Sequence, residues 1–282
     1  MNVIRRSTVS ETGIISLTAE RSRRGHLPWR ERVRKTFPGI ISLGTVAILW
    51  QLSSIFFASV ATPSLQTIAS TMWSIVTDWD QLSNLMVTGA RILAGLIVAF
   101  TIGILVGVLM GLNNVLQTYV RPTLYFIQGI PALSWVVFAV LWFTETEVRV
   151  IFILVMVTFP NFALFIESAV RAVPQDLREL GQAFRASRWD QFRLVVLPQI
   201  SPAILSSWSV NLGNGVRAVV VAELVGATFG VGNRLLLAQS LFDMAAAMAW
   251  TLLLVLMLLL FQTVLNLIES RVMAWRPIGE RS

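Results

Sequence analysis

The stretch from Pro174 to Pro202 reads PQDLRELGQAFRASRWDQFRLVVLPQISP, and it is a charged, amphipathic island between long uncharged apolar runs. Arginine recurs in and beside it, as Arg171, Arg178, Arg185, Arg188 and Arg193. Guanidinium groups are costly inside a bilayer and gather on its cytoplasmic side. The stretch therefore predicts a cytoplasmic loop that contacts a partner.

The composition of the whole chain indicates a membrane protein. Of the 282 residues, 55% are hydrophobic and only 13% are charged, and the mean hydropathy is +0.72. So few polar side chains cannot cover a soluble globule of this length. The absence of cysteine excludes disulfides and thiolate metal sites, and the single histidine, His26, lies in a basic tail, so we expect no metal site.

Apolar runs of about 20 residues, the length that crosses a bilayer, recur along the chain. They predict an all-α polytopic membrane protein with six transmembrane helices, at residues 39–60, 85–112, 124–143, 150–170, 202–226 and 245–268. We expect one integral transmembrane domain over residues 39–275, with the loop 171–201 inside it, between a basic tail at 1–38 and a short tail at 276–282.

The basic residues set the orientation of these spans. With both termini in the cytoplasm, 18 of the 22 lysine and arginine residues fall on the inner side, as the positive-inside rule requires. The outer segments then carry acids, namely Asp78, Asp80, Glu145, Glu147 and Asp243. Because the basic residues bracket the spans and form no single patch, the net charge of +7 does not indicate nucleic acid binding.

Two flanking segments have their own interpretations. Residues 1–38, which are basic and precede an apolar run, resemble a targeting peptide, but the basic region is too long and the apolar run reaches about 20 residues, so a retained signal anchor fits better. Residues 63–79 alternate apolar and polar side chains at near-helical spacing, which predicts a short amphipathic helix on the outer membrane surface.

Two short helices are predicted inside the cytoplasmic loop. The first begins near Pro174 and places Leu177, Leu180 and Phe184 on one face. In the second, Ser187 with Asp190 forms a capping-box arrangement, the helix carries Trp189 and Phe192, and Pro198 ends it. Without a partner, the alternative is that both helices lie on the bilayer surface with their arginines on lipid phosphates.

The order of residues in the loop resembles a known signature. Glu179, then Val195 with Leu197 and Pro198, is similar to the cytoplasmic loop of bacterial ABC importer permeases of type I, in which Glu-Ala-Ala is followed by Gly and by Ile-x-Leu-Pro. The chain also resembles the subgroup that imports sulfonates, taurine, nitrate and bicarbonate, through residues 186–198, Arg91 with Gly95, Gly103, Gly107 and Gly111, residues 141–143, and 221–223 with 230–232.

The loop departs from the family pattern at two places. Glu179-Leu180-Gly181 stands where the family has Glu-Ala-Ala, and Arg185 stands at the glycine of the turn between the helices. Arginine resists the positive φ that glycine allows, so the turn is either of another type or strained.

The resemblance implies a division of labour between subunits. The loop would dock on a separate cytoplasmic ABC ATPase, which would bind ATP and magnesium, while this chain binds no cofactor and is not itself an enzyme. In agreement, Lys35 is the only lysine and no phosphate-binding loop precedes it. Further implied partners are a periplasmic or lipid-anchored solute-binding protein, a second copy of the permease and membrane lipids, in a bacterial inner membrane.

Polar side chains inside the predicted spans are candidates for a substrate path, because charge within a bilayer is usually functional or paired. They are Arg91, Asn161, Asn211, Asn214, Arg217 and Glu223. Either arginine would favour an anion; the alternative for Arg91 is a pair with Glu223 or a lipid phosphate. We interpret the glycine ladder of residues 103, 107 and 111 as a helix-packing face.

The sequence leaves three other functions open. A membrane enzyme lacks any recognisable catalytic set, and an ATP-independent transporter would not need the cytoplasmic loop. A permease for a neutral vitamin-like or aromatic solute would share every feature except the use of the arginines. The residues favour a small anion as cargo.

Overall fold

The computed structural model describes residues 29–56, 62–174, 176 and 187–273. Helix α2 (Trp29–Phe56) belongs to a separate unit, and it covers most of the first expected span, with Pro38 inside it. The described part of the second unit contains helices and no strand. They are α3 (Leu65–Thr77), α4 (Trp79–Leu112), α5 (Asn114–Gly129), α6 (Ala132–Trp142), α7 (Thr146–Arg171), α9 (Arg188–Gln191), the π-helical segment η1 (Phe192–Val196), α10 (Leu197–Leu224), α11 (Val231–Ser240) and α12 (Met244–Val272).

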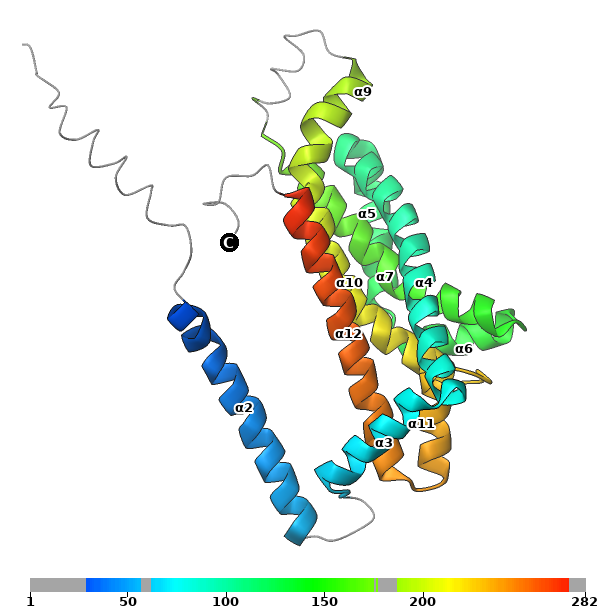
Figure 1. Ribbon diagram of the computed structural model, residues 1–282. Helices are drawn as coiled ribbons and strands as arrows, with labels where there is room; N and C mark the ends of the chain where they lie inside the picture. Colours follow the sequence, from blue (N-terminus) through cyan, green and yellow to red (C-terminus); the bar gives the residue numbers. More distant parts are fainter. Residues whose placement is uncertain (1–28, 57–61, 175, 177–186, 274–282) are drawn as a thin grey trace, which may run out of the picture. The chain divides into compact units, whose positions relative to one another are not determined.

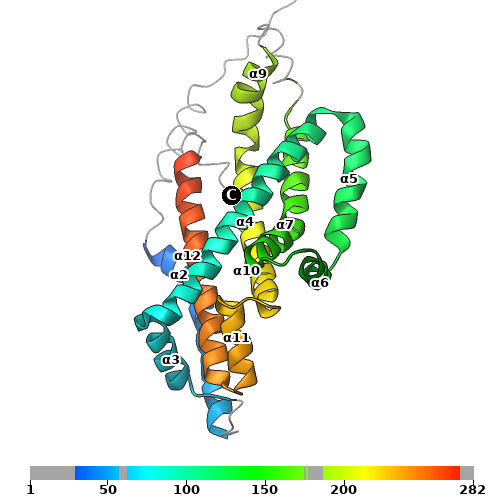
Figure 2. The same ribbon diagram turned by 90° about the vertical axis from the view of Figure 1, so that its right-hand side faces the viewer.

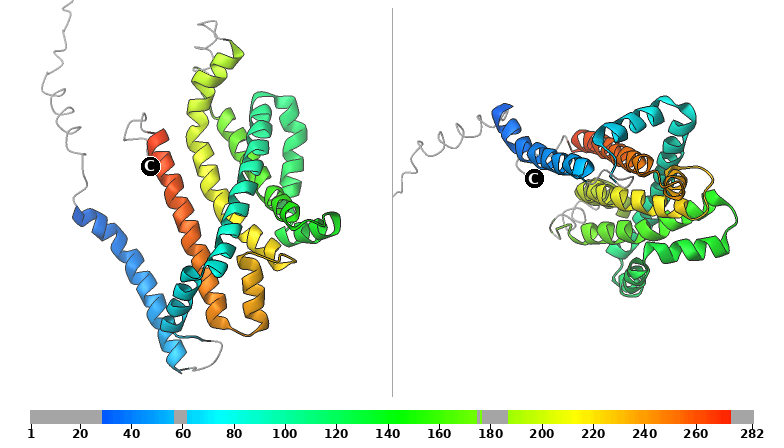
Figure 3. Two further views of the ribbon diagram at one scale, coloured as in Figure 1. Left: turned by 45° about the vertical axis from the view of Figure 1, so that its right-hand side comes forward. Right: turned by 90° about the horizontal axis from the view of Figure 1, so that it is seen from below.

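Helices α4, α7 and α10 form the core of the second unit and lie side by side in Figures 1 and 3. One aromatic group joins all three: the rings of Phe100, Phe162 and Trp208 lie 5.3 to 5.5 Å apart. Helix α12 packs against α10, and α3 packs against α12 and α4. The core therefore brings together segments that are more than 100 residues apart in the sequence.

Glycines on α4 allow the closest approach between helices. A Cβ atom on Gly107 would lie 2.6 Å from the carbonyl oxygen of Ala163, and one on Gly111 would lie 2.6 Å from the Cβ of Val170. A Cβ on Gly103 would collide with Phe162. The packing-face interpretation of the ladder is confirmed, because α7 occupies the space where side chains would be.

The third expected span is not one straight helix. Helices α5 and α6 together are apolar enough to cross a membrane, but they are bent by 92° at the break between them (Figure 2). Pro131 has no N–H to donate and restricts the residue before it to extended backbone, and Ile130 has φ −76° and ψ 123°. The segment between the second and third expected spans, residues 113–123, is also helical from Asn114 onward.

The helix expected to end at Pro198 continues instead. The chain is helical from Arg188 through η1 into α10, with Leu197 donating its N–H to the carbonyl of Phe192, five residues earlier. A proline ring inside a regular α-helix collides with the carbonyl four residues before it. The wider π turn immediately before Pro198 gives the ring room, so the predicted boundary was wrong.

By length and composition, three helices of the described part can cross a membrane, namely α4, α7 and α12, or four with the bent pair. This finding is consistent with a polytopic protein and leaves the count of six as a prediction.

We expect Gly107→Ala to destabilise the bundle by about 1 to 3 kcal/mol, because the new methyl group meets a backbone atom that cannot move aside. Gly129→Ala is the matched control, since a Cβ there has no neighbouring atom within 4 Å. Thermal unfolding in detergent measures both; equal midpoints for the two variants would contradict the packing assignment.

Candidate functional site

A buried carboxylate organises the ends of α4 and α10. Glu223 lies in the last turn of α10 with 0% of its surface exposed. The C-terminal end of a helix already carries negative potential, so an acid there needs hydrogen-bond donors. Thr88 donates to the carboxylate at 2.9 Å, Arg91 Nη1 at 2.7 Å and the Gly232 N–H at 2.9 Å.

The same group of donors fixes the segment after α10. Arg91 Nη1 also donates to the carbonyl of Phe229 at 2.8 Å, and Thr88 Oγ1 accepts from the N–H of Val231 at 2.8 Å. The side chain of Asn84 accepts from the N–H of Gly230 at 3.0 Å. Gly230 has φ +116°, and a Cβ there would collide with the Glu223 carboxylate. Only glycine fits this position.

A second acid completes the cluster from the start of α7. Glu147 receives Arg91 Nε at 2.9 Å and also pairs with Nη2 of the same guanidinium. Unlike Glu223, its side chain is 61% exposed. Arg91, only 6% exposed, therefore joins α4, α7, α10 and the segment before α11. The structure gives Arg91 the pairing with Glu223 that the sequence offered as one alternative.

Sequence reasoning missed three members of this cluster. Glu147 was placed among the outer acids, and Asn84 and Thr88 were not singled out. A signal was present, because Asn84, Thr88 and Arg91 recur at four and three residues and thus share one face of α4.

A second polar cluster lies at the opposite ends of α4 and α7. Glu167, buried on α7, accepts from Gln117 of α5 at 2.6 Å and pairs with Arg171 at 2.8 Å. Arg171 also donates to the carbonyl of Met110, in the last turn of α4, at 3.1 Å. This cluster fixes the end of α7 from which the charged loop departs.

The other polar residues expected along a path are not all brought together. Asn161 accepts a hydrogen bond from Gln128 of α5. Asn211 is fully buried, donates to the carbonyl of Ser207 at 2.9 Å, and finds no partner for its Oδ1 among the described residues. Asn214 is half-buried, and Arg217, one turn further along α10, is exposed. In the described part of the chain, Arg217 makes no hydrogen bond or ion pair, and its guanidinium lies beside Gly213.

About half of the proposed loop surface falls outside the described residues, namely Leu177, Glu179, Leu180, Gly181, Phe184 and Arg185. Of the rest, Ser187 accepts from the N–H of Asp190 at 3.1 Å, as the capping-box prediction requires. The rings of Trp189 and Phe192 stack with centroids 5.8 Å apart. Trp189 is 67% exposed, and Leu194 and Leu197 are exposed beyond it.

The fold and these sites agree with one family. Residues 99–273 match the family described as binding-protein-dependent transport system inner membrane component, and the chain belongs to it. It is a membrane permease component of an ABC importer, in the subgroup named for sulfonate, taurine, nitrate and bicarbonate.

The chain is similar to individual transport proteins over most of its length. The taurine transport system permease protein TauC of Escherichia coli is 26% identical over 248 residues, covering 83% of this chain and 89% of TauC. The nitrate import permease protein NrtB of Leptolyngbya laminosa is 22% identical, covering 71% and 74%. A chain of the MetNI methionine ABC transporter, solved in inward facing conformations, has the same fold with a TM-score of 0.55 at 19% identity, covering 70% of this chain and 99% of that one.

We expect Glu223→Gln to cost more stability than Glu147→Gln, although both remove one negative charge from Arg91. Loss of a buried partner typically costs about 3 to 5 kcal/mol, whereas an exposed pair contributes about 1 kcal/mol or less. Thermal unfolding of the two variants in detergent gives the ranking. Equal losses, or a larger loss for Glu147→Gln, would show that Glu223 does not organise this end of the bundle.

Proposed function

We propose that this chain is the permease subunit of an ATP-driven importer that moves a small anion of the sulfonate, taurine, nitrate or bicarbonate kind. The observation that carries the cargo assignment is Arg217, an exposed cation with no partner in the described structure, on a helix otherwise rich in apolar side chains. An unpaired guanidinium inside a membrane must face water, a carboxylate or a passing anion.

Charge elsewhere in the bundle supports Arg217 over Arg91 as the cargo contact. Arg91 is committed to two carboxylates and a carbonyl, so its positive charge is neutralised locally. Among the described residues Arg217 has no such counter-charge, and Asn214 lies one turn away on the same helix. The relatives named for taurine and nitrate transport support an anionic or zwitterionic cargo.

The proposed role as a permease subunit also implies how the assembly is arranged. Six spans with both termini in the cytoplasm place α9 and the charged loop inside and the Glu223 cluster outside. Two copies would pair in a bacterial inner membrane, an ABC ATPase with ATP and magnesium would dock on the loop, and a binding protein would deliver cargo from outside. Trp189 and Arg217 lie in one continuous helical run, about 40 Å apart along the helix axis.

Arg217→Gln should reduce uptake of the anion at least several-fold while leaving subunit assembly and basal ATP hydrolysis unchanged, because the side chain is exposed and supports no contact of the fold. Arg217→Lys, which keeps the charge, should retain part of the uptake. Val210→Ala, on an exposed site two turns earlier, is the control for altered shape. Uptake in proteoliposomes decides it: full transport by Arg217→Gln, or a neutral cargo, refutes the anion assignment.

Replacing Glu179 and Leu180 together, or Trp189 alone, should release the ATPase subunit during purification. Trp189 presents an exposed apolar surface that the described residues leave uncovered, so its loss should leave the fold intact. Thermal unfolding verifies the fold, and co-purification with the ATPase measures docking. A complex that survives both changes with normal transport-coupled hydrolysis would rule out this loop as the dock.

A further inference from the structure

Helix α3 has two apolar faces, of which one is buried in the bundle and the other is exposed. Ile68 and Ile75 are buried, with Met72 partly buried between them, where α3 packs on α12 and α4. On another face, residues spaced at helical intervals are exposed, and Trp73 is 72% exposed. This stripe consists of Leu65, Ala69, Trp73 and Val76.

The side-chain hydroxyl groups of α3 form their hydrogen bonds within the helix and do not depend on water. Four of its hydroxyl groups donate to carbonyls one turn earlier: Ser70 and Thr71 to Thr67 at 2.9 Å, Ser74 to Thr71 at 2.8 Å and Thr77 to Trp73 at 2.9 Å. The hydroxyl of Thr67 shares a hydrogen bond with that of Ser64. After Lys35, the next charged residue in the sequence is Asp78, which follows α3. A helix whose hydroxyls are satisfied internally and which lacks charge can lie against lipid at low cost.

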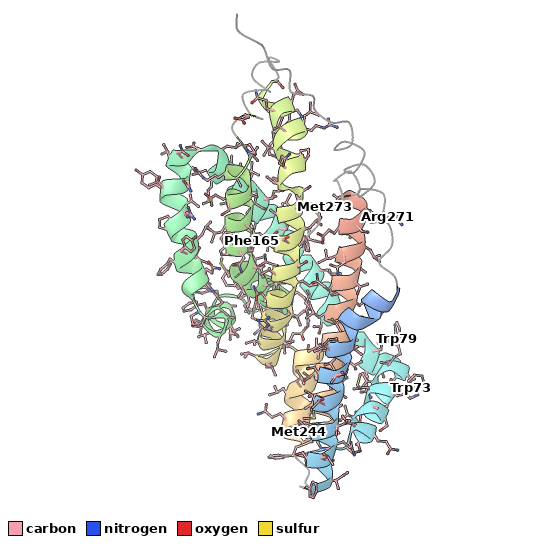
Figure 4. The ribbon with its side chains drawn as sticks, turned by 90° about the vertical axis from the view of Figure 1, so that its left-hand side faces the viewer. Trp73, Trp79, Phe165, Met244, Arg271 and Met273 are labelled. Carbon is pink, nitrogen blue, oxygen red and sulfur yellow. The ribbon has the colours of Figure 1, made fainter. Side chains whose placement is uncertain are left out.

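The position of α3 matches the edge of a bilayer. Helix α12 has 29 residues and is about 43 Å long, which exceeds a hydrocarbon core of about 30 Å. Its C-terminal end carries Glu269 and Arg271, and α3 crosses the opposite half of the helix (Figures 1 and 3). In Figure 4, Trp73 and Trp79 project from the same side of the bundle at this end. Tryptophan concentrates at the headgroup level of membranes.

We propose that α3 is embedded in the outer leaflet, with the stripe of Leu65, Ala69, Trp73 and Val76 against lipid and the indoles of Trp73 and Trp79 at the headgroups. This assignment depends on the orientation given under the proposed function, but not on the cargo. It makes the segment after the first span a membrane anchor, instead of a surface offered to the binding protein. A recognition surface for a soluble protein normally includes a polar rim, whereas α3 has no charged side chain.

The absence of cysteine in the natural chain allows a direct test. Single cysteines at Ala69 and Val76 are spin-labelled in the assembled transporter in lipid nanodiscs, and collision rates with oxygen and with a soluble nickel chelate are measured. Val255→Cys, on the exposed apolar face of α12, serves as the lipid reference, and Glu145→Cys, between α6 and α7, as the water reference. We expect both α3 labels to favour oxygen over nickel, as at Val255.

Two other results would overturn the proposal. Nickel accessibility equal to that at Glu145 would place the stripe in water, and protection from both reagents would mean that protein covers it. Addition of the binding protein should leave the α3 values unchanged; a loss of oxygen accessibility would identify that protein as the occupant. The labels report their surroundings whatever solute is transported, so this test can fail while the anion assignment stands, and the reverse.

Discussion

A carboxylate without any exposed surface imposes the main constraint on this fold. An uncompensated charge in a low-dielectric interior costs several kcal/mol, so Glu223 is tolerated only where enough donors converge. Those donors come from α4 and from the backbone that follows α10, which must therefore fold back over the helix end. The path of residues 225–231, the glycine at 230 and the placement of α11 all follow from satisfying one side chain.

Features set by spacing along one helix could be predicted from the sequence, whereas contacts between helices could be predicted only in part. The glycine ladder and the Ser187 cap were predicted because spacing along one helix determines them. The pairing of Arg91 with Glu223 remained one alternative among three, since 132 residues separate the two and no local pattern joins them. The role of Glu147 was not predicted for the same reason.

Proline caused two different departures from expectation. At Pro131 the backbone turns by 92° inside the span expected at 124–143, because Ile130 before it is extended. At Pro198 the helix does not end, because one extra residue per turn in η1 relieves the collision of the ring. A break is not the rule for proline in this chain, because Pro122, Pro160 and Pro202 also lie inside continuous helices.

The contact between α4 and α7 has a consequence for motion. Gly103, Gly107 and Gly111 bring the backbones so close that neither helix can slide or roll without driving a methyl or carbonyl group into the other. The pair should therefore act as a single rigid body through any cycle of the transporter. Relative displacement is left to the joints that lack such interlocking, above all the corner between α5 and α6. Distance reporters placed across α4 and α7 would be silent throughout turnover, which makes this pair the natural frame against which the movement of every other helix can be measured.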